Sequence, residues 1–233
     1  MMKKNCTLFL VVVLCVTLLI GIASAEDGFA SALNPRRDYL IVVNDNSPFD
    51  WTSDYYFYLQ QDCVVVADVY DGDPIYVEKA AYLAFTMLQH DLYQQGMVVG
   101  LYDAYRSFKT QEAVAAYYGN LEGWSETNKT FQPGYSEHHT GLLLNVMIWY
   151  SEDGEHYEWY TESAERQETI PYFKLLHERL ADYGFIDRFP KGKEEWTGAP
   201  SEPYEIRFVG SSEVAHEIMD NGLCLEEYLS LNK

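Results

Sequence analysis

Apolar residues recur at helical spacing in one long stretch of the chain. Between Val77 and about Gln95 they fall three or four positions apart, at Ala81, Phe85, Leu88 and Leu92. This spacing is typical of an amphipathic helix, and Gly96 follows where a helix C-terminus favours glycine. The pattern predicts a helix over 77–95.

Three later stretches also have helix signals. Ser107 precedes the stretch 108–119, which ends in Gly119, and serine is a favoured N-cap. Residues 170–184 form a second helical stretch with Gly184 as its stop. The third is a capped helix over 211–222, followed by the last segment, 223–232.

Runs of β-branched and apolar residues predict strands between these helices. They lie at 38–43, before a turn-rich loop to 50, at 63–70, before a turn at 71–74, at 97–105 and at 142–150. A hairpin turning at Asp153-Gly154 and short strand-like pieces at 185–192 and 202–210 follow. Strands mix with helices and hairpins without a βαβ rhythm, which predicts an α+β fold with a central antiparallel sheet flanked by helices.

The first 25 residues have the pattern of a secretory signal. Lys3 and Lys4 precede a largely apolar run, and Ala23-Ser24-Ala25 supplies small residues for cleavage. The run is short for a membrane anchor, the alternative interpretation. We therefore expect a signal peptide at 1–25, one domain at 26–233, and a secreted or cell-wall-associated protein without a membrane segment after cleavage.

Charge and cysteine content narrow the possible partners. The net charge is −20, which disfavours nucleic acid and anionic membranes as partners. Two cysteines, Cys63 and Cys224, remain after the predicted cleavage. They can form one disulfide in an exported protein or remain as two buried thiols, and the sequence leaves both possibilities open.

Four separated stretches together carry the parts of a hydrolytic site. "AYRSFKTQ" places Arg106 and Gln111 at a strand-to-helix junction, and an arginine there can grip a carboxylate with two hydrogen bonds. "SEHHTG" and "LLLN" supply Ser136, His138 and Asn145, and "SEPYEIRFVG" supplies Glu202 and Glu205. A histidine, further oxygen ligands and a glutamate that activates water are the parts of a metal-assisted hydrolase. Considered alone, a histidine beside a strand such as His138 is more often an ordinary hydrogen-bonded residue than a metal ligand.

These stretches together resemble the VanY-type D-alanyl-D-alanine carboxypeptidases, zinc peptidases that trim peptidoglycan stem peptides. "SEHHTGLLLN" fits the family pattern S-x-H-x-x-G-x-x-x-D except at its last position. "EPYEIRFVG" follows the pattern E-P-W-H then R-Y-V-G with two changes in its first part, and "YRSFKTQ" matches the family's Y-R-S followed by glutamine. The resemblance runs from about Tyr39 to the C-terminus and implies the D-Ala-D-Ala carboxypeptidase/hedgehog-like fold.

The resemblance also implies roles for individual residues. His138, Asn145 and Glu205 occupy the three zinc-ligand positions, two of them substituted, and Glu202 occupies the position of the general base. Arg106, Gln111 and Ser136 occupy the positions that hold the substrate. The expected partner is a peptidoglycan stem peptide, or another peptide with a free C-terminal carboxylate.

The two substituted positions alter the expected chemistry. In the family these are aspartate and histidine, and here they are Asn145 and Glu205. An amide oxygen is a poor zinc ligand beside a carboxylate, so we expect weak zinc binding and impaired catalysis. The alternatives are an active metal-dependent D,D-carboxypeptidase with an atypical site and an exported scaffold without pocket function. His139 is expected to point away from His138 and to be structural.

Overall fold

The computed structural model describes residues 25–70, 73–120, 129–151, 153–155, 158–160 and 170–232. The helices are α1 (Ala25–Ala30), α2 (Asp54–Asp62), α3 (Lys79–Gln94), α4 (Phe108–Gly119), α7 (Pro171–Arg179), α8 (Glu194–Thr197), α9 (Ser212–Asp220) and α10 (Leu225–Leu231). Two 3-10 turns are η1 (Glu137–Thr140) and η2 (Ala181–Tyr183). The strands are β1 (Cys63–Tyr70), β2 (Asp73–Glu78), β3 (Val98–Asp103), β4 (Leu143–Tyr150), β5 (Glu158–Tyr160), β6 (Phe185–Asp187) and β7 (Glu205–Phe208).

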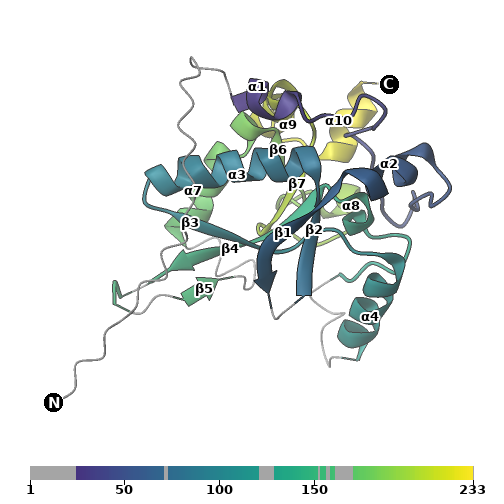
Figure 1. The fold of residues 1–233 in the computed structure, drawn as a ribbon, viewed down its shortest axis with the longest axis horizontal. Helices are drawn as coiled ribbons and strands as arrows, with labels where there is room; N and C mark the ends of the chain where they lie inside the picture. The colour runs from purple at the N-terminus through teal and green to yellow at the C-terminus, as the bar shows by residue number, and fades with distance from the viewer. Residues whose placement is uncertain are drawn as a thin grey trace.

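The strand β4 is the centre of an antiparallel sheet (Figure 1). β3 pairs along one edge of β4, while β7 and β5 pair with successive parts of the other edge. β6 extends the sheet beyond β7, and β1 and β2 form a separate two-stranded ribbon. The expected α+β fold with a central antiparallel sheet flanked by helices is confirmed.

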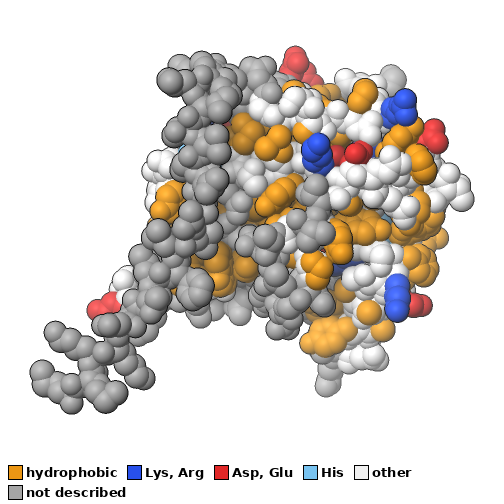
Figure 2. All heavy atoms as spheres, in the orientation of Figure 1, with side chains coloured by type: hydrophobic (Ala, Val, Ile, Leu, Met, Phe, Trp, Pro, Cys, Tyr) orange, Lys and Arg blue, Asp and Glu red, His pale blue; other side chains and the backbone are white. Residues whose placement is uncertain are grey.

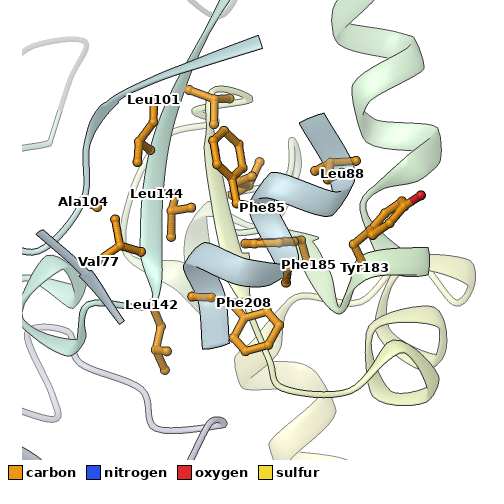
Figure 3. Packing of buried hydrophobic residues seen from close by; sticks show 14 of the residues in the cluster. Val77, Phe85, Leu88, Leu101, Ala104, Leu142, Leu144, Tyr183, Phe185 and Phe208 are labelled. Carbon is orange, nitrogen blue, oxygen red and sulfur yellow. The ribbon is translucent and has the colours of Figure 1, made fainter. Parts of the chain in front are cut away.

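The helix α3 packs its apolar side against this sheet (Figure 1). Phe85 and Leu88 from α3 meet side chains from the strands, among them Leu101, Leu144 and Phe208 (Figure 3). All of these residues are at most 2% exposed. At roughly 25 cal/mol per Å² of buried apolar area, such packing is the main stabilising contribution to the fold.

The structure corrects two of the predicted elements. Residues 38–43 form no strand, and the nearby bridge joins only Asn44 and Ser47. Carbonyl groups of this segment, those of Tyr39 and Ile41, instead accept hydrogen bonds from the Arg207 guanidinium. The helix predicted over 170–184 is also shorter, because α7 ends at Arg179 and η2 follows before the left-handed Gly184.

The chain has 36 acidic and 16 basic residues. On the face shown in Figure 2, the basic side chains stand apart from one another among polar and hydrophobic ones. Within the described ranges, no helix has the length and apolar character needed to span a bilayer. The predicted signal segment 1–25 lies outside them except for Ala25. Cys63 and Cys224 are both free thiols in the part of the chain that the structure describes.

Candidate active site

The seven candidate residues line one cavity of about 180 Å³. They are Arg106, Gln111, Ser136, His138, Asn145, Glu202 and Glu205. The strands β3, β4 and β7 contribute side chains to this cavity, and α4 and η1 contribute others. Positions up to 99 residues apart in the sequence therefore meet in one place.

Three of the lining residues form a row across adjacent strands. Asn145 on β4 is paired with Asp103 on β3 at one side and with Glu205 on β7 at the other. Directly opposite residues in an antiparallel sheet project from the same face. The ladder of β4 and β7 thus places Asn145 and Glu205 next to each other, and it adds Asp103, which the sequence analysis did not identify.

His138 is held in one orientation by the backbone. Its Nδ1 atom is hydrogen bonded to the carbonyl of Ala104, and its Nε2 atom lies 3.5 Å from Oε1 of Glu205. Two donors that bind the same tetrahedral zinc at 2.0–2.2 Å are about 3.4 Å apart. The spacing of His138 and Glu205 therefore suits two ligands of a single cation.

Asn145 adds an oxygen atom to this arrangement. Its amide nitrogen lies 3.5 Å from the hydroxyl of Tyr102. Its Oδ1 atom and the Nε2 atom of His138 are both buried without a hydrogen-bond partner among the described residues. Buried lone pairs of this kind cost about 1–3 kcal/mol each unless something binds them.

These donor atoms suit a divalent cation that is harder than zinc better than they suit zinc itself. His138, Asn145 and Glu205 would hold it, and a bound cation would polarise a carbonyl and activate water. The carboxylate and the amide favour a harder ion than zinc. No cluster of three or more histidine, cysteine or acidic residues suited to a metal occurs within the described ranges, and one of the three positions here is an amide.

Glu202 and Glu205 share one proton in this geometry. Burial and the charge of Glu205 raise the pKa of Glu202 to about 9. Burial acts in the same direction on Glu205, but the neighbouring His138 and the charge of Arg106 outweigh it and lower the Glu205 pKa below its usual value. At neutral pH Glu202 is therefore protonated, and it cannot accept a proton from water until that proton is removed.

The three residues expected to hold the substrate line the same cavity. Arg106 donates from Nη1 to Oε1 of Gln111 at 3.1 Å, and Gln111 donates to the carbonyl of Phe131 at 2.7 Å. Arg106 also contacts Asp103 through Nε at 2.7 Å and Nη2 at 2.5 Å. Ser136 is buried at the N-terminus of η1.

A buried ionic cluster, made of Glu137, Arg188, Arg207 and Glu226, anchors the turn that carries Ser136 and His138. Glu137 accepts hydrogen bonds from Arg188 at 2.6 Å and from Arg207 at 2.5 Å. The sequence analysis missed this role, although Arg207 lies in the quoted stretch "EPYEIRFVG". His139 does point away from His138: it is bonded to the carbonyl of Arg106 and to the amide of Gly134.

Comparison with known proteins gives the family of the chain. Residues 74–211 match the model of the VanY family, described as D-alanyl-D-alanine carboxypeptidase. A D-alanyl-D-alanine carboxypeptidase of Enterococcus faecalis is 30% identical over 210 residues, which cover 83% of this chain and 66% of that protein. The chain spans between 46% and 66% of the length of the curated relatives it matches.

Solved structures support the same assignment. VanYB in complex with D-alanine-D-alanine is 25% identical, with a TM-score of 0.61, over 84% of this chain and 99% of that one. The VanY D,D-pentapeptidase of a VanB-type resistance cassette, in complex with Zn(II), has the same identity and TM-score over 83% of this chain and 99% of that one. The chain therefore belongs to the VanY family of D-alanyl-D-alanine carboxypeptidases.

Proposed function

We propose that this protein binds the C-terminal end of peptidoglycan stem peptides and that its ability to hydrolyse them is impaired. The observation that carries the proposal is the composition of the cavity that the candidate residues line. Arg106, Gln111 and Ser136 line its substrate side, while Asn145 and Glu205 stand at metal-ligand positions. A neighbouring structure of the family contains D-alanine-D-alanine, which is the ligand chemistry that we carry over to this chain.

Impaired hydrolysis follows from the two substitutions. Weakening one interaction around a metal site typically costs about 10- to 100-fold in affinity or activity, and two ligand positions differ here. Burial and the charge of Glu205 also raise the pKa of Glu202, the expected base, to about 9, so that Glu202 keeps its proton. A base with its proton in place does not activate water at neutral pH.

An active metal-dependent D,D-carboxypeptidase is the second candidate function. The 3.5 Å spacing of His138 and Glu205 and the two unsatisfied buried atoms favour it, because a bound cation would satisfy both atoms. A cation would also favour the ionised form of Glu202. In this alternative Glu202 is the general base.

One experiment separates these two functions. The affinity of the purified protein for a peptide ending in D-Ala-D-Ala is measured by calorimetry, and release of D-alanine is followed in the same sample. We expect binding with little or no release. Release that Glu202→Gln abolishes would establish the active enzyme instead, and absence of binding would contradict both candidates.

We also propose that the protein is exported, on the pattern of residues 1–25. Peptidoglycan lies outside the cytoplasmic membrane, so export brings the pocket to its proposed ligand. N-terminal sequencing of the protein recovered from the culture medium or the cell wall tests this. We expect a mature chain that begins near Glu26.

A further inference from the structure

The guanidinium of Arg106, the expected carboxylate grip, already holds a carboxylate of the same chain. Its Nε and Nη2 atoms lie 2.7 and 2.5 Å from the same oxygen of Asp103. These two atoms form the side edge of the guanidinium, which is one of the edges that pairs with carboxylates. Both side chains are largely shielded, at 13% exposure for Arg106 and 29% for Asp103.

Few donors of Arg106 remain for a ligand. A guanidinium has five N–H groups, and Asp103 and Gln111 together use one from each of its three nitrogens. One N–H on Nη1 and one on Nη2 are left. A ligand carboxylate that uses them must lie beside the carboxylate of Asp103, or it must displace Asp103 from the guanidinium.

The local backbone fixes Asp103 in this position. The pairing of β3 with β4 shifts in register between Leu101 and Asp103, and a strand irregularity of this kind re-aims the side chain that follows it. Asp103 is then the direct partner of Asn145 in the ladder. Asp103 therefore contacts Arg106 from a fixed position at the end of β3, and not as a side chain that moves freely on the surface.

The remaining charges of the cavity do not compensate for Asp103. Lys129, the other basic residue that lines it, is paired with Asp45 at 2.5 Å. Glu202 and Glu205 also line the cavity, and as carboxyl groups they supply no positive charge. An anionic ligand that enters this cavity therefore meets an arginine whose charge is already balanced.

We propose that Asp103 is a specificity-determining residue that competes with the ligand carboxylate for Arg106. It lowers the preference of the pocket for peptides with a free C-terminus over peptides whose C-terminus is neutral. Like charges brought together in a binding site reduce affinity. This inference rests on the proposed function, because it assumes that Arg106 faces the end of a bound peptide.

The test compares two peptides on three proteins. Calorimetry measures binding of N-acetyl-L-Lys-D-Ala-D-Ala with a free C-terminus and of its C-terminal amide to the wild type, Asp103→Asn and Asp91→Asn. Asp91 pairs with Arg179 at 2.8 Å and does not line the cavity, so it is the matched control for loss of an aspartate–arginine pair. Asp103→Ser is a second neutral variant in case Asp103→Asn folds poorly.

The expected result is about tenfold tighter binding of the free-acid peptide by the Asp103 variants, with no change for the amide. Asp91→Asn should bind both peptides as the wild type does. If both Asp103 variants bind the free-acid peptide no more tightly than the wild type does, this inference is overturned. Binding of the peptide by the wild type would still support the proposed function. If neither the wild type nor any variant binds either peptide, this inference and the proposed function are both overturned.

Discussion

Replacing Glu137 with glutamine tests how the fold holds the turn that carries Ser136 and His138. The Glu137 side chain is 1% exposed, and its two oxygens accept from the Nε atoms of Arg188 and Arg207. Burial alone would lower the pKa of Arg188, but the carboxylates of Glu137 and Glu226 raise it above its usual value. Both arginines are charged, and the carboxylates of Glu137 and Glu226 neutralise their positive charges.

The size of the effect follows from what the glutamine leaves behind. Its amide keeps one acceptor oxygen, but it presents an N–H group to an arginine N–H and leaves the cluster with one more positive charge. Breaking a buried ion pair on one side costs about 3–5 kcal/mol. For a domain of about 200 residues, each kcal/mol lowers the melting temperature by about 2–4 °C. Glu137→Gln should therefore lower it by about 6–20 °C.

Thermal melting followed by circular dichroism measures this change. The matched control is Glu178→Gln, which removes an exposed partner from a 3.7 Å pair with Lys174. Such a surface pair contributes about 0–1 kcal/mol, so the control should melt within about 4 °C of the wild type. If Glu137→Gln melts as close to the wild type as the control does, the cluster does not anchor the turn, and the argument from burial is refuted.

Two further predictions concern the pocket, and a third concerns His139. Asn145→Asp combined with Glu205→His should raise zinc affinity by at least about 100-fold and bring release of D-alanine, as measured by competition with a metal indicator and by an amino-acid assay; equal zinc affinity in the wild type would contradict it. Arg106→Ala should weaken binding of peptides with a free C-terminus by about 10- to 100-fold and leave amidated ones unaffected. An Arg106→Ala protein that binds the free-acid peptide as tightly as the wild type does would argue against the carboxylate grip. Burial lowers the pKa of His139 from 6.5 to about 4. Between these two values the unfolded chain binds one more proton than the folded protein, so the stability should fall as the pH drops through this window. The melting temperature should depend less on pH between 4 and 7 in His139→Gln than in the wild type, and an identical pH dependence would show that His139 is not the cause.

The elements that the sequence predicted well are those with local signals. α4 begins and ends where expected because Ser107 caps it, accepting from the Thr110 amide at 3.1 Å. α3 likewise ends just before the left-handed Gly96. In contrast, the apolar run at 38–43 looked like a strand, and only the distant Arg207 explains why its carbonyls are not used in a ladder.

The candidate site also contains residues with a clear sequence signal and residues whose role depends on contacts that the sequence does not show. Its seven candidate residues stand in family motifs that are readable from the sequence, so their positions were named before their contacts were known. The role of Glu137 depends on partners 51 and 70 residues away, which no local pattern connects. Asp103 is only three residues from Arg106, but their contact depends on the register shift in β3. A spacing of three residues predicts contact in helices and not at strand ends.

The proposed function depends most directly on whether the unmodified protein binds zinc tightly. After dialysis against metal-free buffer, the mature protein should contain clearly less than one zinc per chain by elemental analysis. The same preparation should bind a D-Ala-D-Ala peptide and release little or no D-alanine. One tightly held zinc per chain, together with D-alanine release that Glu202→Gln abolishes, would contradict the account.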